Sequence, residues 1–273
     1  MTVPHNAEQM GTGPNTPQEP RRTLVLGTSS MARELAQAYE RLGCETRTGT
    51  VARAGEFDAQ LIATTGDSPD TLAEVAAVAE ETGAEVAPSV SACHQTADRL
   101  AVRKQASEEL GLPTLDYEFA STPQEMQDAI ERIGYPCVVK APTSNDGEGF
   151  SFVRSSADLA VAWSNADRGV GQGAVVERFI DFDFECTILA ARSIDPNTGE
   201  LATWFCEPIG TRHREGRLVE AWQPAPLPEG AMDNARSIAA RITGALASCG
   251  VFSIELFVSG DDVYFSQVTP RPS

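Results

Sequence analysis

The stretch FSIELFVSGDDVYFSQVTPRP, residues 252–272, decides how the end of this chain folds. Two runs in which apolar and polar side chains alternate flank a Gly-Asp-Asp segment, a pattern typical of a β-hairpin. Glu255 lies among large apolar residues in the first run, and Gln267 holds a comparable place in the second. The two face each other only if residues 260–262 form a three-residue loop, because a shift of one residue turns a strand's side chains to its opposite face. The alternative is that Glu255 is an exposed strand residue without a ligand.

Composition limits the classes of protein to consider. The chain has 273 residues, of which 41% are hydrophobic, so it has room for two modest globular domains. Its 39 acidic and 21 basic residues give a net charge of -18, which argues against nucleic acid or an anionic membrane as partner. No apolar run approaches the roughly 20 residues that span a bilayer, so we expect a cytoplasmic protein. The cysteines are scattered without a CxxC pair, which favours reduced core residues over a zinc site or disulfides.

The first part of the chain predicts a tail and then a parallel sheet. Residues 1–20 contain four prolines and few large apolar side chains, which is typical of a disordered segment. A domain over residues 21–91 follows, because strands and helices alternate there. The spacing predicts strands at 23–27, 60–63 and 85–87, and helices at 29–42 and 69–82. The turn at Gly27 is expected to be structural, since a dinucleotide fingerprint needs three glycines.

Residues 92–273 predict an α+β domain. The pattern indicates helices at 92–110 and 123–134, then a short apolar strand that ends at Lys140. A lysine at that place, next to a glycine-bearing loop at residues 143–150, would neutralise a polyphosphate, although a solvated lysine fits the pattern equally well. Glu177 and Glu185 flank an apolar segment that would suit an adenine and its ribose, but acidic residues between strands are more often only solvated.

Five stretches of this chain together resemble the ATP-grasp superfamily, and most closely its formate-dependent glycinamide ribonucleotide transformylases. They are EELGLPTLDYEFA, IGYPCVVKAP, VVERFIDFDFE, FCEPIGTRHREGRLVEAWQPAPL and the hairpin quoted above. The resemblance implies a parallel-sheet (pre-ATP-grasp) α/β domain followed by an α+β ATP-grasp module. Members of that family use ATP and Mg²⁺ to activate formate as formyl phosphate, which then formylates an amine.

The resemblance also implies a set of site residues. Those expected to hold ATP are Arg99 and Lys140 at the phosphates, the covering loop Asn145, Asp146, Gly147, Glu148, Gly149 and Phe150, the adenine hinge Glu177, Arg178, Phe179 and Ile180, and the ribose acceptor Glu185. Glu255 and Gln267 stand where both hairpin strands of the family carry a magnesium-binding glutamate.

Several positions depart from the family pattern. Glu148 replaces a lysine, and a carboxylate about 4 Å from a phosphate charge costs about 1 kcal/mol in water and about 4 kcal/mol at an effective dielectric of 20. Gln267 offers an oxygen without the charge on which hard cations in phosphate sites usually depend. Ser30 and Met31 stand where the family places a ribonucleotide-binding glutamate. The family's C-terminal domain has no counterpart before Ser273.

These departures predict a nucleotide-binding relative whose catalysis is impaired or lost. One alternative is an active formyltransferase or carboxylate ligase that acts through an acyl phosphate, and another is an interaction protein that no longer binds ATP. The small-molecule acceptor stays open, and a homo-oligomer is expected by analogy alone. Arg212, His213, Arg214 and Arg217 form a basic cluster that would reach a triphosphate or a carboxylate, or would simply be solvated. His213 is disfavoured as a general base, because the sequence shows no partner to orient it.

Overall fold

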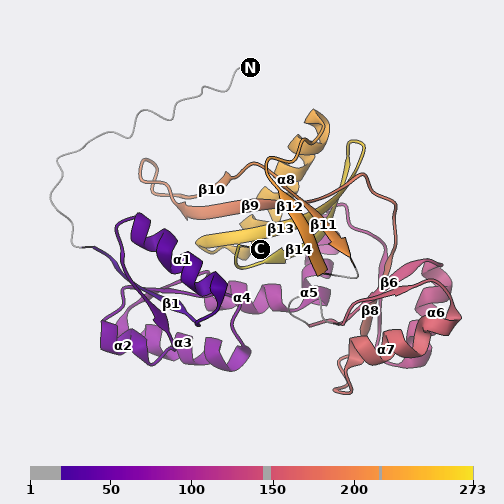
Figure 1. Ribbon diagram of the computed structural model, residues 1–273, viewed down its shortest axis with the longest axis horizontal. Helices are drawn as coiled ribbons and strands as arrows, with labels where there is room; N and C mark the ends of the chain where they lie inside the picture. Colours follow the sequence, from indigo (N-terminus) through magenta and orange to yellow (C-terminus); the bar gives the residue numbers. More distant parts are fainter. Residues whose placement is uncertain (1–19, 144–148, 215–216, 273) are drawn as a thin grey trace.

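The first domain is a four-stranded parallel sheet with helices on both sides. The computed structural model describes residues 20–143, 149–214 and 217–272. The strand order is β2-β1-β3-β4, and every neighbouring pair is parallel, as expected from the alternating pattern. Figure 1 shows this domain at one end of the molecule. Its elements are β1 (Arg22–Leu26), α1 (Ser30–Arg41), β2 (Glu45–Gly49), α2 (Arg53–Phe57), β3 (Leu61–Ala63), α3 (Pro69–Thr82) and β4 (Glu85–Ala87).

Two elements of this domain were missed because they carry weak patterns. The strand β2 reads ETRTG and lies at the edge of the sheet, so only its last residue is buried. The helix α2 has five residues, too few for a helical period to be recognised. The turn after β1 serves α1 as expected: the Ser29 hydroxyl accepts from the Ala32 amide at 3.1 Å and so caps the helix.

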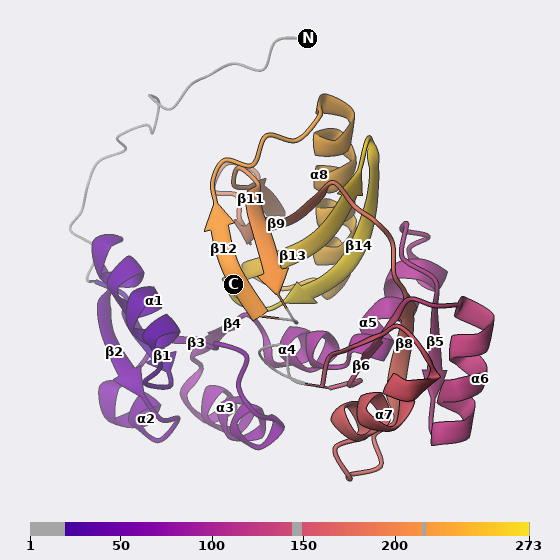
Figure 2. The ribbon, with the colours of Figure 1, turned by 45° about the vertical axis from the view of Figure 1, so that its right-hand side comes forward.

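A second, antiparallel sheet forms a separate lobe. Its strand order is β5-β8-β6-β7, and the helices α6 and α7 cover one face, with Met126, Ile130 and Val139 in the shared core. Figure 2 shows these helices on the outside of the lobe. The elements are β5 (Tyr117–Ala120), α6 (Pro123–Ile133), β6 (Cys137–Lys140), β7 (Ser151–Val153), a 3-10 turn (Ser156–Asp158), α7 (Leu159–Asp167) and β8 (Ala174–Arg178).

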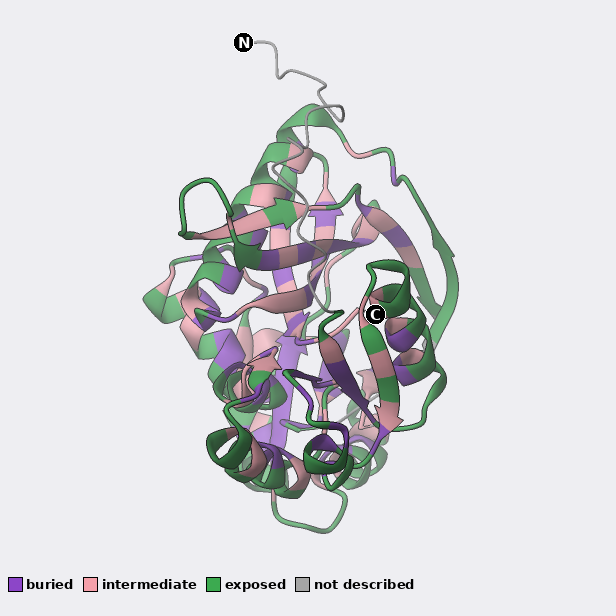
Figure 3. Ribbon diagram, turned by 90° about the vertical axis from the view of Figure 1, so that its left-hand side faces the viewer, coloured by how far each residue is buried: buried purple, intermediate pink, exposed green. Residues whose placement is uncertain are grey.

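The third sheet has six strands and contains the largest core. The order is β12-β11-β9-β13-β14, and β10 also pairs with β9. Along its central strands, buried residues largely alternate with partly buried ones, whereas Figure 3 shows exposed residues on the helices at the surface of the molecule. One face packs on α8, where Ile188, Ile242, Phe252 and Ile254 are fully or almost fully buried. The elements are β9 (Phe184–Ile194), β10 (Leu201–Phe205), β11 (Ile209–Arg214), β12 (Arg217–Trp222), α8 (Glu229–Leu246), β13 (Gly250–Ser259) and β14 (Asp262–Thr269).

The helix expected at 92–110 is wrong, because three shorter helical segments occupy that stretch. They are α4 (Val90–Ala97), α5 (Arg99–Lys104) and a π-helical turn (Gln105–Glu109). Asp98 interrupts the helix with an extended backbone, and its carboxylate accepts from the amides of Leu100 and Ala101. The break re-aims the chain, so that α5 runs between the first domain and the second lobe, below the third sheet (Figure 2).

The hairpin β13–β14 corrects the expected loop. Ser259 pairs with Asp262, so the turn has two residues, Gly260 and Asp261, rather than three. This register alone would place Glu255 and Gln267 on opposite faces. However, the register shifts by one residue beyond Leu256, which pairs with Phe265, and Glu255 therefore pairs with Gln267. Ser266 is the extra residue of this β-bulge, and the bulge returns the two side chains to one face.

Some expectations fall outside the described residues. These are almost all of the tail at 1–20 and the loop positions Asn145, Asp146, Gly147 and Glu148. Among the helices that the structure describes, none is long and apolar enough to cross a membrane.

The loop expected to cover the phosphates has a glycine at its described end, Gly149, which gives a test of the fold. Gly149 has φ +73°, and a Cβ there would lie 2.5 Å from the Ala141 Cβ. Gly171 has the same φ but open space around it. We expect Gly149→Ala to lower the free energy of unfolding by about 1 to 3 kcal/mol and Gly171→Ala by about 1 kcal/mol. Equal losses in denaturant titrations would show that the contact with Ala141 is unimportant.

Candidate nucleotide site

A small cavity lies where α5, β6, β8 and β14 meet. It joins the second lobe to the third sheet, with three cations and one carboxylate in its wall. The residues that line it are Thr96, Arg99, Val102, Arg103, Lys140, Glu177, Ser266 and Gln267. The expected phosphate residues Arg99 and Lys140 thus share one cavity with the hairpin residue Gln267.

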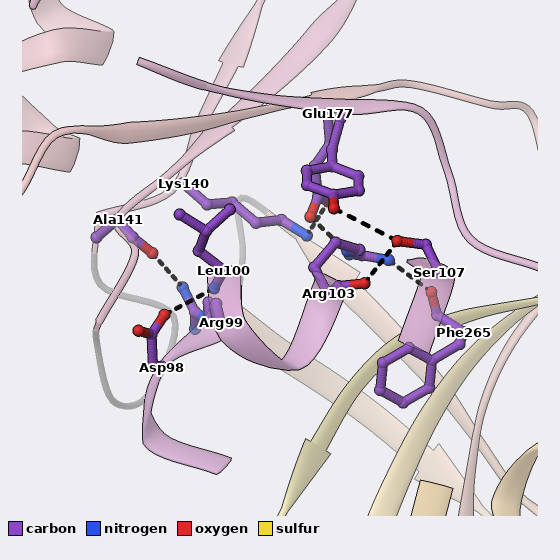
Figure 4. Close-up of polar contacts among 10 residues, drawn as sticks. Asp98, Arg99, Leu100, Arg103, Ser107, Lys140, Ala141, Glu177 and Phe265 are labelled. Atoms are coloured by element: carbon purple, nitrogen blue, oxygen red, sulfur yellow. Dashed lines mark hydrogen bonds and ion pairs between the residues drawn. The ribbon is translucent and has the colours of Figure 1, made fainter. Parts of the chain in front are cut away.

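Glu177 is the buried centre of this cavity. Its side chain is 5% exposed, and its two carboxylate oxygens accept from different cations. The Arg103 Nη2 donates to Oε1 at 2.6 Å, and the Lys140 Nζ donates to Oε2 at 2.6 Å (Figure 4). Burial opposes the charged carboxylate, but the charges and hydrogen bonds of Arg103 and Lys140 outweigh it and lower the pKa of Glu177 to about 2. The hinge carboxylate is therefore committed to two protein cations.

Arg99 has a buried hydrogen-bond donor that the protein leaves without an acceptor. Its Nη1 donates to the Ala141 carbonyl at 3.3 Å, while its Nε has no hydrogen-bond partner within the described part of the chain. Burial lowers the pKa of Arg99, although Glu177 and Glu255 favour its charged form. A buried guanidinium donor without a partner is costly unless a ligand completes it. The donors here suit an anion such as a phosphate.

Glu255 and Gln267 lie opposite each other on paired strands, and Gln267 lines this cavity. Neither side chain has a hydrogen-bond partner among the described residues. Burial raises the pKa of Glu255, and His213 and Lys140 partly offset the increase. Two oxygen-bearing side chains without protein donors fit the partial ligand set of a hard cation. In the described residues no three His, Cys, Asp or Glu side chains are grouped to hold a metal on their own.

His213 has the orienting partner that sequence reasoning did not find. Its Nδ1 lies 2.7 Å from the Glu185 Oε2, because β11 pairs with β9 and brings together residues that are 28 positions apart. The hydrogen bond to Glu185 raises the pKa of His213, while burial opposes the increase. Arg212 instead pairs with Glu220, and both side chains are well exposed. Arg212 therefore lies in an exposed ion pair, and His213 lies close enough to Glu255 to lower the pKa of that carboxyl. The side chains of Arg214 and Arg217 lie outside the described residues.

The hinge residues beyond Glu177 have separate environments. Phe179 makes an edge-to-face contact with Phe152, with the ring centroids 4.9 Å apart. Arg178 points to an exposed ion pair with Asp116 at 2.8 Å. Because the Glu177 carboxylate is occupied, any contact with a base at this hinge would come from backbone groups and from the apolar surface of Phe179 and Ile180.

The family model of the ATP-grasp domain matches residues 105–273. The chain belongs to the ATP-grasp family. Within it, the chain is related to formate-dependent phosphoribosylglycinamide formyltransferases. That of Corynebacterium efficiens is 44% identical over 288 residues, covering 94% of this chain and 71% of the relative. That of Burkholderia pseudomallei (strain 668) is 40% identical over 293 residues, covering 97% of this chain and 72% of the relative.

Solved structures agree with this ATP-grasp assignment. A glycinamide-RNase-transformylase T from Mycobacterium tuberculosis is 31% identical with a TM-score of 0.74, covering 93% of this chain and 74% of that one. A carboxyaminoimidazole ribonucleotide synthase from Aspergillus clavatus, solved with ATP, has a TM-score of 0.78 at 18% identity. It covers 93% of this chain and 71% of that one, and it shows the fold alone.

Arg103 is the site residue of this ATP-grasp chain that sequence reasoning missed. It lies four residues after Arg99 on a helical stretch, and side chains four residues apart share one face of a helix. That spacing was the available signal, since Arg99 was already placed at the phosphates. The partner Glu177 lies 74 positions away and gave no local sign of the pairing.

The buried ion pairs predict a strong pH dependence. Because the pKa of Glu177 is about 2 in the folded chain and 4.5 ordinarily, its stabilisation is complete above about pH 4.5 and is lost as the pH falls toward 2. We expect Glu177→Gln to lower the free energy of unfolding at pH 7 by on the order of 3 kcal/mol, with the deficit shrinking below pH 4.5. Urea titrations from pH 7 to 2.5 measure this.

The exposed pair Arg132–Glu118 in the same lobe supplies a matched control. Glu118→Gln should change stability little, because solvent screens exposed pairs. A deficit for Glu177→Gln that is small, or that does not depend on pH, would contradict the buried network.

Proposed function

We propose that this chain binds Mg-ATP in the cleft between the lobe of β5–β8 and the sheet of β9–β14, and that its turnover is impaired. One observation carries the proposal: Arg99, whose buried Nε has no hydrogen-bond partner in the described part of the chain, lines the same cavity as Lys140 and Gln267. A ligand with several anionic oxygens would complete this donor and would also explain the need for two further cations nearby.

Local charge supports a polyphosphate ligand. The chain as a whole carries -18, yet the cavity wall holds Arg99, Arg103 and Lys140 against the single carboxylate of Glu177. A positive cavity in an acidic protein is expected for a bound anion rather than for general solubility. Residues 177–180 would supply backbone groups to the base, and Phe179 an apolar surface.

The paired side chains of Glu255 and Gln267 would hold Mg²⁺ together with phosphate oxygens. A bound Mg²⁺ neutralises phosphate charge, which matters most during phosphoryl transfer. Gln267 contributes no charge to that task, so turnover should suffer more than binding. The Glu148 carboxylate would act in the same direction if it lies near the phosphates, although it belongs to the residues that the structure does not describe.

A second candidate function is full turnover as a formate-dependent formyltransferase or another carboxylate ligase. The bulge at Ser266 favours it, because it keeps Gln267 beside Glu255 and so preserves two oxygen donors in the cleft. Formate-dependent phosphate release from Mg-ATP would support this candidate. The acceptor that would receive the acyl group remains a small molecule of unassigned identity.

The chain's two lysines, Lys104 and Lys140, permit a direct test of ATP binding. Lys104 is exposed, whereas Lys140 lines the cavity. We expect millimolar Mg-ATP to slow acetylation of Lys140 by acetic anhydride, measured by mass spectrometry, and to leave Lys104 unchanged. A micromolar site would also stabilise the fold by about 4 kcal/mol under these conditions. If Mg-ATP neither protects Lys140 nor changes the melting temperature, the protein no longer binds ATP.

A second prediction concerns the two departures from the family pattern. We expect the double variant Glu148→Lys and Gln267→Glu to bind Mg-ATP more tightly than the parent by on the order of tenfold or more, and to raise ADP formation. Without Mg²⁺, Gln267→Glu alone should lower the melting temperature, because it places a second carboxylate opposite Glu255. Isothermal titration calorimetry and an ADP assay measure the first two effects. Unchanged affinity and ADP formation would mean that these two positions do not lie beside the phosphates.

A further inference from the structure

Arg103 connects the two halves of the cleft. It is 3% exposed, and its guanidinium donates to acceptors in two different sheets. Its Nη1 donates to the Phe265 carbonyl on β14 at 2.7 Å, and its Nη2 donates to Glu177 on β8 at 2.6 Å. Figure 4 shows the side chain reaching from α5 toward both residues. Within the described chain, this side chain makes the bond between the hairpin and the central strand of the second lobe.

The charge of Arg103 also determines how far Glu177 neutralises the charge of Lys140. Glu177 is one carboxylate shared by two cations, at 2.6 Å from each. With Arg103 in place, the three groups carry a net positive charge toward the cavity. Without it, Glu177 and Lys140 would form a closed pair whose charges cancel, in a buried place where the separation of that pair is expensive.

We propose that Arg103 is a positioning residue: by sharing Glu177 and tying it to the hairpin, it keeps the Lys140 ammonium available to an anionic ligand. The proposal deepens the proposed Mg-ATP site and rests on it. Arg103 itself acts through Glu177 and Lys140. The same helix, α5, also carries Arg99. One short helix would therefore place Arg99 directly and Lys140 through Arg103 and Glu177.

A double-mutant cycle separates this role from that of a simple structural bridge. We expect Arg103→Met to raise the Kd for Mg-ATP by on the order of tenfold or more, because Glu177 then holds Lys140 alone. Adding Glu177→Gln to Arg103→Met should restore the Kd to within about threefold of the parent, because no buried carboxylate competes for Lys140. Arg103→Lys should also stay within about threefold, since it keeps the charge beside Glu177.

The controls guard against loss of fold. Arg132→Met removes an exposed arginine from the same lobe and should leave the Kd unchanged. Circular dichroism at low temperature confirms that each variant is folded. If Arg103→Met does not fold, the double variant and Arg103→Lys carry the test. A double variant as weak as Arg103→Met, an Arg103→Lys that loses tenfold or more, or an unchanged Kd for Arg103→Met would overturn the proposal.

A measurement without ligand keeps this proposal distinct from the proposed function. The acetylation rate of Lys140 relative to Lys104 should fall in Arg103→Met, because an undivided carboxylate holds Lys140 in a closed ion pair, and should rise in Glu177→Gln, which removes that pair. Arg132→Met should leave the ratio unchanged. If the parent chain fails to bind Mg-ATP, the proposed function fails. In that case the proposal for Arg103 is judged by this ratio, and the same ratio in the parent, Arg103→Met and Glu177→Gln would overturn it.

Discussion

The buried carboxylate of Glu177 is the constraint on which the rest of the cleft depends. A charge in so enclosed a place persists only if it is neutralised, and Arg103 and Lys140 do this at its two different oxygens, each at 2.6 Å. Each cation comes from a different element, so satisfying one charge fixes the positions of α5, β6 and β8 together. Arg103 extends the constraint to β14 through the Phe265 carbonyl. The electrostatics of one side chain thereby set the relation between the second lobe and the third sheet.

The β13–β14 hairpin shows how one β-bulge determines which side chains share a face of the sheet. A regular two-residue turn would separate Glu255 from Gln267, since side chains alternate strictly along a strand. The bulge at Ser266 adds one residue and restores their common face. The sheet accepts this irregularity near a cleft, where bulges commonly redirect side chains. The bulge therefore fixes the place of Gln267 beside Glu255, and the side chain at 267 brings an amide oxygen without a charge.

The cleft contains both charged groups that are paired with one another and charged groups with polar atoms that have no partner in the described chain. Glu185 accepts from His213, Glu177 accepts from Lys140, and the carboxylate of Glu255 and the Nε of Arg99 have no hydrogen-bond partner among the described residues. A ligand with anionic oxygens and a cation would serve both of the unpartnered groups, which explains why the fold tolerates their burial. Of the cysteines expected in the cores, Cys93, Cys137 and Cys186 are buried, whereas Cys44 and Cys249 are partly buried and Cys206 is exposed.

The sequence by itself determined the elements with strong local signals, and the tertiary structure decided the contacts among the charges. Periodicity and capping residues placed α3 at 69–82 and ended β6 at Lys140, because such signals act over neighbouring residues. The break at Asp98, the bulge at Ser266 and the bonds of Glu177 to Arg103 and of Glu185 to His213 could not be predicted in this way. The two carboxylate contacts depend on segments 28 and 74 positions apart being packed together, and only the folded chain fixes which charge meets which partner.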